Sequence, residues 1–345
     1  MDKRMKNTVT LGSTGITVNK NGFGALPIQR ISDEAAVHLL KKAYESGINY
    51  YDTARAYTDS EKKIGLALSH VREHIYIATK TMSTDVDGFW RDLEESLENL
   101  KTTYVDIYQF HNPAFCPKPG DGSGLYEAME EARAQGKIRH IGITNHRLEV
   151  AREAIRSGLY ETLQFPFCYL AAEQDLELVR MCREQNMGFI SMKALSGGLI
   201  TNSAAAYAFQ AQFDHVLPIW GVQREKELDE FLSYIENPPV MDEAMEALIE
   251  EEKKALSGNF CRGCGYCMPC PVGIEINNCA RMSLLIRRSP SESQLTPQVQ
   301  AKMAKIADCL HCGQCKSKCP YGIDTPALLE ENYKDYQEIL GGKPL

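Results

Sequence analysis

Between residues 22 and 236 the sequence repeats one pattern eight times: a short run rich in β-branched and aromatic residues is followed by an amphipathic helical stretch. Such an alternation predicts parallel strands joined by crossover helices. The predicted strands are GFGAL from residue 22, NYYDTA from 49, HIYIATK from 74, YVDIYQF from 104, IRHIGIT from 138, TLQFPF from 162, GFISMKA from 188 and HVLPIWGV from 215. Because eight repeats close a barrel rather than an open sheet, we expect an α/β fold, a (β/α)8 TIM barrel.

Local signals support these elements. The helix predicted over 32–46 begins at Ser32, which can cap it, and has Glu34 in its first turn. The segment 9–18, VTLGSTGITV, has glycines between two β-branched runs. It therefore predicts a hairpin that covers the bottom of the barrel.

The composition changes sharply after the eighth repeat. Two prolines at 238–239 precede an acidic helical pattern, and beyond it the segment 261–270 alone holds four cysteines. A barrel needs about 250 residues, so the 345-residue chain has room for a small second domain. We predict a barrel over 1–239, a connecting helix over 240–256 and a mainly α-helical domain over 257–345.

The cysteines of the second domain fall into two groups with ligand-like spacing. The first spells C-x2-C-x2-C-x2-C-P and the second C-x2-C-x2-C-x3-C-P; their members are Cys261, Cys264, Cys267 and Cys270, and Cys309, Cys312, Cys315 and Cys319. The second spacing is that of bacterial ferredoxins, in which the fourth cysteine ligates the other cluster. The spacing therefore predicts two [4Fe–4S] clusters, one held by Cys261, Cys264, Cys267 and Cys319, the other by Cys309, Cys312, Cys315 and Cys270.

Other interpretations of the cysteines remain. Structural zinc also takes C-x2-C pairs, but it needs neither a third closely spaced cysteine nor Cys-Pro. The first group ends with a two-residue gap where ferredoxins have three, so Cys279 is an alternative to Cys270 as a ligand. Single cysteines on barrel elements are typically buried and inert, and we assign no function to Cys116, Cys168 and Cys182.

Charge and hydropathy exclude some functions. A net charge of −8 and an isoelectric point of about 5.6 argue against nucleic acid as a partner. No stretch approaches the ~18 apolar residues of a membrane span, and no apolar signal segment follows the basic start. We therefore expect a cytoplasmic protein, where cysteines serve as metal ligands or in catalysis rather than in disulfides.

Four polar residues lie where predicted barrel strands end, the side on which such barrels carry out catalysis. They are Asp52, Tyr57, Lys80 and His111. A tyrosine hydroxyl is a poor acid at neutral pH, and a neighbouring lysine ammonium held by a carboxylate makes it a better one. Each residue alone also has an ordinary structural explanation: a surface aromatic, a solvated charge or a satisfied core histidine.

The motifs that contain these residues resemble the aldo-keto reductase family over residues 8 to about 235. They occur in the family's order: D-T-x3-Y from Asp52, Y-V-D-I-Y-x2-H ending at His111, I-G-I-T-N from 141 and Q-F-x3-Y-L from Gln164. The resemblance implies that Tyr57 donates a proton, Lys80 assists it, Asp52 holds Lys80 and His111 positions a carbonyl oxygen. A nicotinamide would supply hydride to the carbon.

The same resemblance implies a set of cofactor-binding residues. Thr144, Asn145 and Gln164 would hold the nicotinamide carboxamide, with Gly22 also in the cofactor site; Gly197, Gly198 and Leu199 would follow the pyrophosphate; and Arg224 and Lys226 would meet a 2′-phosphate. Acidic neighbours oppose that last contact, so NADPH is only modestly favoured over NADH. Met192 stands where the family usually has an aromatic ring on the nicotinamide, so cofactor packing differs here.

The ferredoxin-like C-terminal domain resembles that of the iron–sulfur-bearing branch of this family. Iron–sulfur centres move single electrons and nicotinamide moves two, and no flavin motif is evident. The main hypothesis is an NAD(P)H-dependent reductase of an aldehyde or ketone whose clusters transfer electrons, with a redox protein as a candidate partner. The alternatives are a ferredoxin-driven reductase of another organic substrate, a nicotinamide-binding redox sensor, and clusters that are only structural.

Overall fold

Eight parallel strands close into a barrel in the computed structural model, which describes residues 7–256, 260–288 and 291–345. The strands are β3 (Gly22–Gly24), β4 (Tyr50–Asp52), β5 (Tyr76–Thr81), β6 (Val105–His111), β7 (Ile138–Thr144), β8 (Thr162–Pro166), β9 (Gly188–Met192) and β10 (Val216–Gly221). They are hydrogen-bonded in chain order, and β10 pairs with β3 to close the ring. The eight predicted strands and the barrel are thus confirmed.

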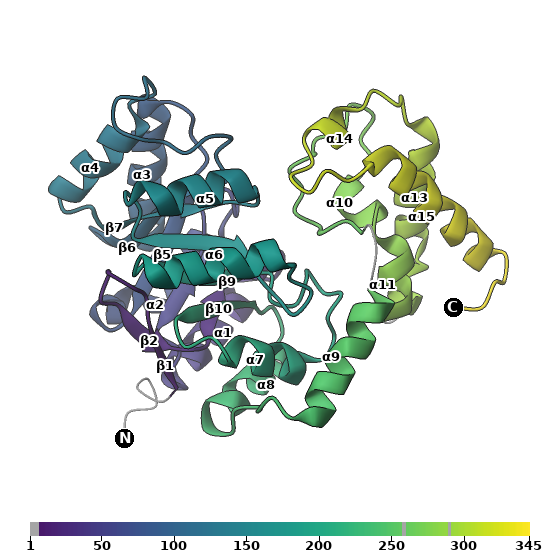
Figure 1. Ribbon diagram of the computed structural model, residues 1–345, viewed down its shortest axis with the longest axis horizontal. Coiled ribbons are helices and arrows are strands. Elements are labelled where there is room, and N and C mark those ends of the chain that lie inside the picture. Colours follow the sequence, from purple (N-terminus) through teal and green to yellow (C-terminus); the bar gives the residue numbers. More distant parts are fainter. Residues whose placement is uncertain (1–6, 257–259, 289–290) are drawn as a thin grey trace. The chain divides into compact units, whose positions relative to one another are not determined.

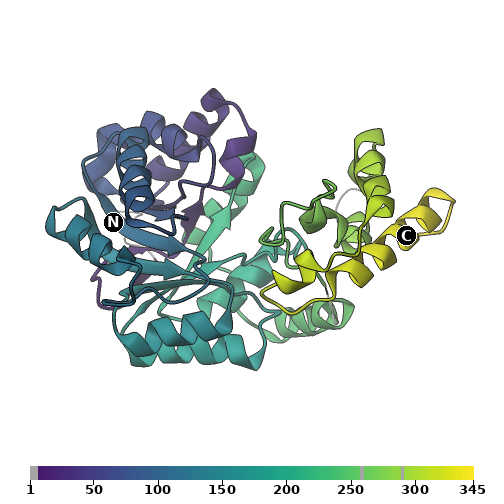
Figure 2. The same ribbon diagram turned by 90° about the horizontal axis from the view of Figure 1, so that it is seen from above.

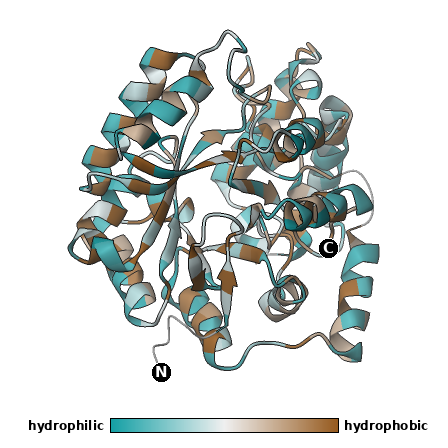
Figure 3. Ribbon diagram, turned by 60° about the vertical axis from the view of Figure 1, so that its left-hand side comes forward, coloured by the Kyte–Doolittle hydropathy of each residue, from teal (hydrophilic) through white to brown (hydrophobic). Residues whose placement is uncertain are grey.

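Helices follow the strands and surround the barrel (Figures 1 and 2). They are η2 (Pro27–Arg30), α1 (Asp33–Glu45), α2 (Ser60–Leu68), η3 (Ser69–His74), α3 (Val86–Leu100), α4 (Leu125–Ala134), α5 (Leu148–Ser157), α6 (Glu173–Glu184), α7 (Ser203–Ala211) and α8 (Glu225–Glu236). As predicted, the Ser32 side chain caps α1 by accepting from the Ala35 amide at 3.3 Å. The helices carry both hydrophobic and hydrophilic residues (Figure 3), and on α3 it is Phe89, Leu93 and Leu97 that are buried.

The predicted hairpin is present as β1 (Thr8–Thr10) and β2 (Thr17–Asn19), paired antiparallel. Its apolar residues, among them Leu11 and Val18, are buried with residues from inside the barrel strands such as Tyr50 and Leu217. Both barrel residues lie in the first half of their strands, so the hairpin covers the end opposite the strands' carboxyl termini. This leaves the carboxyl-terminal end to carry the polar residues.

A buried carboxylate joins three elements of the barrel. Glu61 of α2 accepts from the Thr79 hydroxyl of β5 at 2.6 Å and from the Ser96 hydroxyl of α3 at 2.7 Å. Its second oxygen accepts from Arg55, which also pairs with the half-exposed Glu95 at 2.9 Å. Because both oxygens face donors, one of them the Arg55 cation, this charge can be buried without a large penalty.

The remaining elements of the described chain are helices, joined by the loops that carry most of the cysteines. They are α9 (Glu243–Ala255), α10 (Ile276–Cys279), α11 (Met282–Arg288), α12 (Ser291–Gln294), α13 (Pro297–Ala304), η4 (Lys305–Asp308), α14 (Gln314–Ser317) and α15 (Thr325–Leu340). A core that includes Ile274, Met303 and Leu329 holds α10 to α15 together. Arg287 and Asp335 tie α11 to α15 through two hydrogen bonds of 2.6 and 2.9 Å.

Contacts divide the chain into two compact units. The first comprises Met1–Ala194 and Ala204–Met245, and the second comprises Leu195–Ser203 and Glu246–Leu345. The short segment 195–203, which connects β9 to α7, therefore packs with the cysteine-bearing unit. The predicted boundary at residue 257 lies outside the described residues.

Within the described ranges, no helix is both long and apolar enough to cross a membrane.

We expect Glu61→Ala to lower the free energy of unfolding of the barrel by about 3–5 kcal/mol, because Arg55 and two hydroxyls lose a buried partner. Glu95→Ala, which removes the exposed partner of the same arginine, should cost under about 1 kcal/mol. Urea unfolding followed by tryptophan fluorescence measures both, since the two tryptophans, Trp90 and Trp220, lie in the barrel. Equal losses in the two variants would contradict this account of Glu61.

Candidate active site and cysteine pockets

A buried ion pair lies at the centre of the barrel site. Lys80, on β5, donates from Nζ to Asp52 Oδ1 at 2.7 Å and to the carbonyl oxygen of Thr53 at 2.6 Å. Asp52 ends β4, the strand next to β5, so parallel pairing brings the two side chains together. Burial raises the pKa of Asp52 and lowers that of Lys80, and each charge acts against the shift of the other. Two acceptors on one nitrogen suit an ammonium group, so we describe the pair as charged.

Tyr57 and His111 lie beside this pair. The Lys80 Nζ is 5.4 Å from the centre of the Tyr57 ring, and the Tyr57 and His111 rings meet edge to face with centroids 5.7 Å apart. Tyr57 is half-buried in the turn between β4 and α2, where its backbone amide donates to the Ala54 carbonyl at 2.9 Å. The structure thus brings together all four residues of the predicted tetrad.

The environment of His111 keeps its ring neutral. Burial, together with the nearby Lys80 charge, lowers the pKa of His111 from 6.5 to about 3. Its Nδ1 is buried and, among the described residues, has no hydrogen-bond partner. A neutral imidazole has one N–H to donate, which suits contact with a carbonyl oxygen.

Gln164 extends the Asp52 site toward the predicted carboxamide-binding residues. Its Nε2 donates to Asp52 Oδ1 at 3.3 Å, and its Oε1 accepts from Gln109 at 2.9 Å. The Thr144 hydroxyl, also buried, contacts the Met192 sulfur at 3.9 Å. Met192 therefore lies next to one predicted carboxamide-binding residue.

Asn145 already has partners for its side-chain amide. Its Nδ2 donates to the Pro113 carbonyl at 2.9 Å, and its Oδ1 accepts from the amides of His146 and Arg147 at 2.9 and 2.8 Å. These bonds shape the loop after β7, so the structure itself shows a turn-forming role for Asn145.

Gly22 lies at the first position of β3, away from the carboxyl ends of the strands. A Cβ there would be 2.9 Å from Ile219 Cγ2 and 3.0 Å from the Pro218 carbonyl oxygen. Close packing against β10 accounts for the glycine, and its predicted place in the cofactor site stays a prediction.

The basic residues after β10 are exposed at the start of α8. Arg224 donates from Nε to Glu227 at 2.7 Å, and Glu227 also accepts from the Gln223 and Arg224 amides. Lys226 lies on the exposed side of the same turn. Arg224 would have to exchange Glu227 for a phosphate in order to bind one.

The segment 195–203 presents glycines with left-handed backbone. Gly197 and Gly198 are exposed, with φ of +64° and +93°, whereas Leu199 is fully buried. The Gly198 amide donates to the Leu195 carbonyl at 2.9 Å. Exposed main chain of this kind can approach a phosphate closely, as predicted for Gly197 and Gly198, while the Leu199 side chain serves packing.

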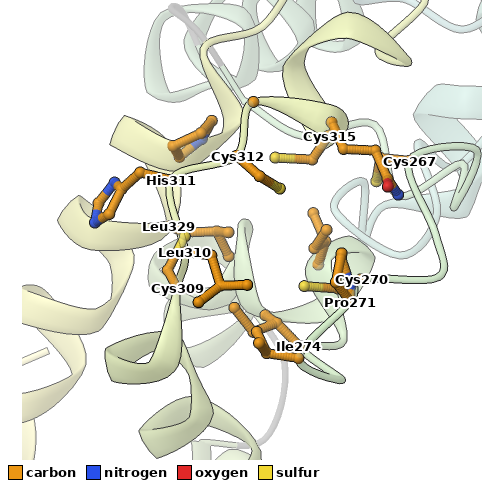
Figure 4. A pocket seen from close by; sticks show the side chains of 15 residues that line it. Cys267, Cys270, Pro271, Ile274, Cys309, Leu310, His311, Cys312, Cys315 and Leu329 are labelled. Atoms are coloured by element: carbon orange, nitrogen blue, oxygen red, sulfur yellow. The ribbon is translucent and has the colours of Figure 1, made fainter.

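The cysteine-bearing unit contains two pockets, each bordered by cysteines from both groups. The first cysteine pocket, about 400 Å³, is lined by Cys267, Cys270, Cys309, Cys312 and Cys315. The second cysteine pocket, about 350 Å³, is lined by Cys261, Cys264, Cys267 and Cys319. Figure 4 shows Cys270 and Cys309 on opposite sides of the first pocket, with Cys312 between them and Cys315 alongside. The members of each predicted ligand set thus lie around one pocket, and Cys267 lines both pockets.

Thiolates from two directions around such spaces fit iron–sulfur clusters, which are held by four cysteines each. Within residues 7–256, 260–288 and 291–345, no group of three or more His, Cys, Asp or Glu side chains could hold a metal ion. The eight cysteines instead surround the two larger spaces.

Cys279 lies outside both pockets. Its sulfur donates to the Lys302 carbonyl at 3.7 Å, and burial raises its pKa to about 11. This favours Cys270 over Cys279 as a ligand. Of the single barrel cysteines, Cys116 is likewise buried, and its pKa is raised to about 11.

Two residues near the sites were missed by sequence reasoning. Gln109 supports Gln164, and only its polar side chain two residues before His111 on the same strand could have marked it. Arg281 donates to the Gly197 carbonyl and is buried beside the second cysteine pocket. Nothing in the spacing around Arg281 indicated this place.

Family models match both parts of the chain. The aldo/keto reductase family model matches residues 20–206, and the 4Fe-4S dicluster domain model matches residues 260–324. The two matches agree with the resemblance drawn from the motifs.

Curated relatives match part of the barrel. L-galactose dehydrogenase of Arabidopsis thaliana is 29% identical over 211 residues, 55% of this chain and 66% of the relative. Methylglyoxal reductase DkgB of Salmonella typhi is 34% identical over 148 residues, 41% of this chain and 52% of the relative. These matches span less than two thirds of the relatives' own length.

Solved structures share the fold. An aldo-keto reductase from Bacillus halodurans in its holo form has a TM-score of 0.63 at 19% identity, covering 72% of this chain and 96% of that one. One from Klebsiella pneumoniae in complex with NADPH has a TM-score of 0.61 at 20% identity, covering 72% and 95%. With a family match over more than half of its 345 residues, the chain belongs to the aldo/keto reductase family and carries a 4Fe-4S dicluster domain after the barrel.

Proposed function

We propose that this protein is an NAD(P)H-dependent oxidoreductase that reduces an aldehyde or ketone and transfers electrons through two [4Fe–4S] clusters. The observation that carries the proposal is the Lys80 ammonium, held by Asp52 at 2.7 Å and facing the Tyr57 ring at 5.4 Å. A buried cation beside a tyrosine is the arrangement that turns its hydroxyl into a usable acid. We place the reaction in the cytoplasm, where cysteines stay reduced and available to iron.

The tetrad residues divide the chemistry between them. Tyr57 donates its hydroxyl proton to the carbonyl oxygen as negative charge develops there, and Lys80 stabilises the phenolate that remains. Asp52 keeps Lys80 in place, and the neutral His111 donates one N–H to the same oxygen. When bound, the nicotinamide supplies the hydride for the carbonyl carbon.

The nicotinamide carboxamide would lie against Thr144, Asn145 and Gln164, of which Gln164 also contacts Asp52. Because the Asn145 side chain already makes the hydrogen bonds of the turn, it would contact the carboxamide only through further hydrogen bonds. The exposed glycines Gly197 and Gly198 would approach the pyrophosphate. We propose NADPH over NADH through Arg224 and Lys226.

For the clusters, we assign Cys309, Cys312, Cys315 and Cys270 to the first cysteine pocket and Cys261, Cys264, Cys267 and Cys319 to the second. A redox protein that exchanges single electrons with them is the proposed partner, beside the small-molecule carbonyl substrate. Cys267 borders both pockets, so the two clusters would be close neighbours.

We expect Tyr57→Phe to lower kcat for carbonyl reduction at least about 100-fold, because general acid catalysis contributes 10²–10⁴-fold. NADPH affinity, measured by fluorescence titration, should stay within about threefold, since the phenyl ring is kept. Tyr44→Phe, on α1, is the matched control and should leave both quantities unchanged. Undiminished turnover in Tyr57→Phe would overturn the assigned role.

The pH dependence of kcat/KM tests His111. Because its pKa is lowered from 6.5 to about 3, the ring stays neutral at every pH above about 4 and becomes charged only below that range. We therefore expect that any decline in kcat/KM of the wild type between pH 8 and pH 5 is also seen in His111→Gln, because protonation of His111 does not cause it. An acid limb near pH 6.5 that disappears in His111→Gln would show that the ring is protonated there.

Iron and acid-labile sulfide, measured on anaerobically purified protein, test the ligand assignment. We expect about eight irons in the wild type, and clearly fewer in Cys270→Ser, which loses a ligand of the first cysteine pocket. Cys279→Ser should keep the full content, because that thiol lies outside both pockets. The reverse result would make Cys279 the ligand, and zinc in place of iron would remove the clusters from the proposal.

The visible spectrum before and after NADPH addition then tests electron transfer. Bleaching by NADPH would support clusters that exchange electrons with the nicotinamide site. Full iron content without bleaching would favour an external electron donor or structural clusters.

A further inference from the structure

Arg281 carries a buried positive charge in the cysteine-bearing unit. It lies between α10 and α11 and is 6% exposed. Its Nη2 donates to the Gly197 carbonyl, and its Nε is buried without a hydrogen-bond partner. Within the described part of the chain no carboxylate pairs with it. Burial of an uncompensated guanidinium is costly, so a neighbouring negative charge is the expected compensation.

The neighbouring candidate for that charge is the second cysteine pocket. The Arg281 guanidinium packs against Gly263, where a Cβ would lie only 2.1 Å from Nη1. The Gly263 amide donates to the Cys261 sulfur at 3.3 Å, and Cys261 lines the second pocket. Gly263 has φ of +65°, so a glycine both permits this turn and lets the cation come close. Arg281 therefore contacts Gly263, and the amide of Gly263 is hydrogen-bonded to a proposed cluster ligand, Cys261.

The surroundings of the first cysteine pocket are different. Among the described residues, His311 is the one ionisable side chain besides the cysteines that lines it, and it is largely exposed and 3.6 Å from Glu330. Behind the pocket lies Lys305, whose Nζ is 3.2 Å from the position of a Cβ at Gly273, but this side chain is exposed. The second pocket is lined by Arg262 in addition to having Arg281 behind it. A buried cation acts on a nearby charge more strongly than an exposed, screened one, so Arg281 makes the larger difference between the pockets.

We propose that Arg281 raises the reduction potential of the cluster held by Cys261, Cys264, Cys267 and Cys319 above that of the cluster in the first cysteine pocket. This inference rests on the proposed presence of two clusters. Gain of one electron makes a cluster more negative by one charge, and a fixed positive charge stabilises that reduced form. Of the two clusters, the one beside Arg281 is therefore reduced first when an external reductant supplies electrons.

Arg288 provides a matched control. It also donates to segment 195–203, at the Leu199 carbonyl at 3.0 Å, but its charge is neutralised by Glu252 at 2.7 Å. Loss of Arg288 removes a comparable loop contact without removing an uncompensated cation. A comparison of the two arginines thus separates an electrostatic role from a merely structural one.

The test is an anaerobic dithionite titration of the full chain, followed by electron paramagnetic resonance and visible absorbance. In the wild type we expect two distinct potentials, and Cys319→Ser should alter the higher one. Arg281→Gln should shift the higher potential to more negative values and leave the lower one in place. Arg281→Lys, which keeps the charge, should restore most of the difference, and Arg288→Gln should change neither potential.

Several results would overturn the inference. These are equal potentials in the wild type, a higher potential that belongs to the first cysteine pocket, unchanged potentials in Arg281→Gln with full iron content, or the same shift in Arg288→Gln. The wild-type comparison decides the matter even where Arg281→Gln fails to assemble. A chain that holds no iron would instead reject the proposed clusters, so the two failures are distinguishable.

Discussion

The buried ion pair between Lys80 and Asp52 is the interaction on which the barrel site depends. Each charge is tolerated inside the barrel only because the other is 2.7 Å away. The same contact holds the Lys80 ammonium beside the Tyr57 ring, and the Asp52 carboxylate also accepts a hydrogen bond from the Gln164 amide. Adjacent strands supply the two charges, so the strand pairing that builds the barrel also brings these two side chains together.

Much of the fold could be predicted from the sequence because local sequence patterns specify its strands and helices. The alternation of strand and helix signals located all eight strands, and Ser32 marked the start of α1. The tetrad was predictable for a related reason, since its residues sit at or near strand ends that parallel pairing must bring together. Segment 195–203 was different: its membership in the second unit depends on contacts distant in sequence.

The two cysteine groups show how far spacing alone can be followed. The gaps between cysteines predicted two ligand sets, and the members of each set line one pocket, with Cys267 lining the other pocket as well. Spacing alone left Cys270 and Cys279 open, because both thiols are near enough along the chain; in the structure Cys270 lines the first cysteine pocket, whereas Cys279 lies outside both pockets. Arg281 carried no signal at all, since a buried arginine and an exposed one look alike in a sequence.

Segment 195–203 leaves the barrel at Ala194 and rejoins it at Ala204, yet its carbonyls at Gly197 and Leu199 accept hydrogen bonds from Arg281 and Arg288. The cysteine-bearing unit is therefore built from two separate stretches of the chain, 195–203 and 246–345. A gene truncated after Met245 would encode every barrel strand, but segment 195–203 would lose both arginines that donate to its carbonyls.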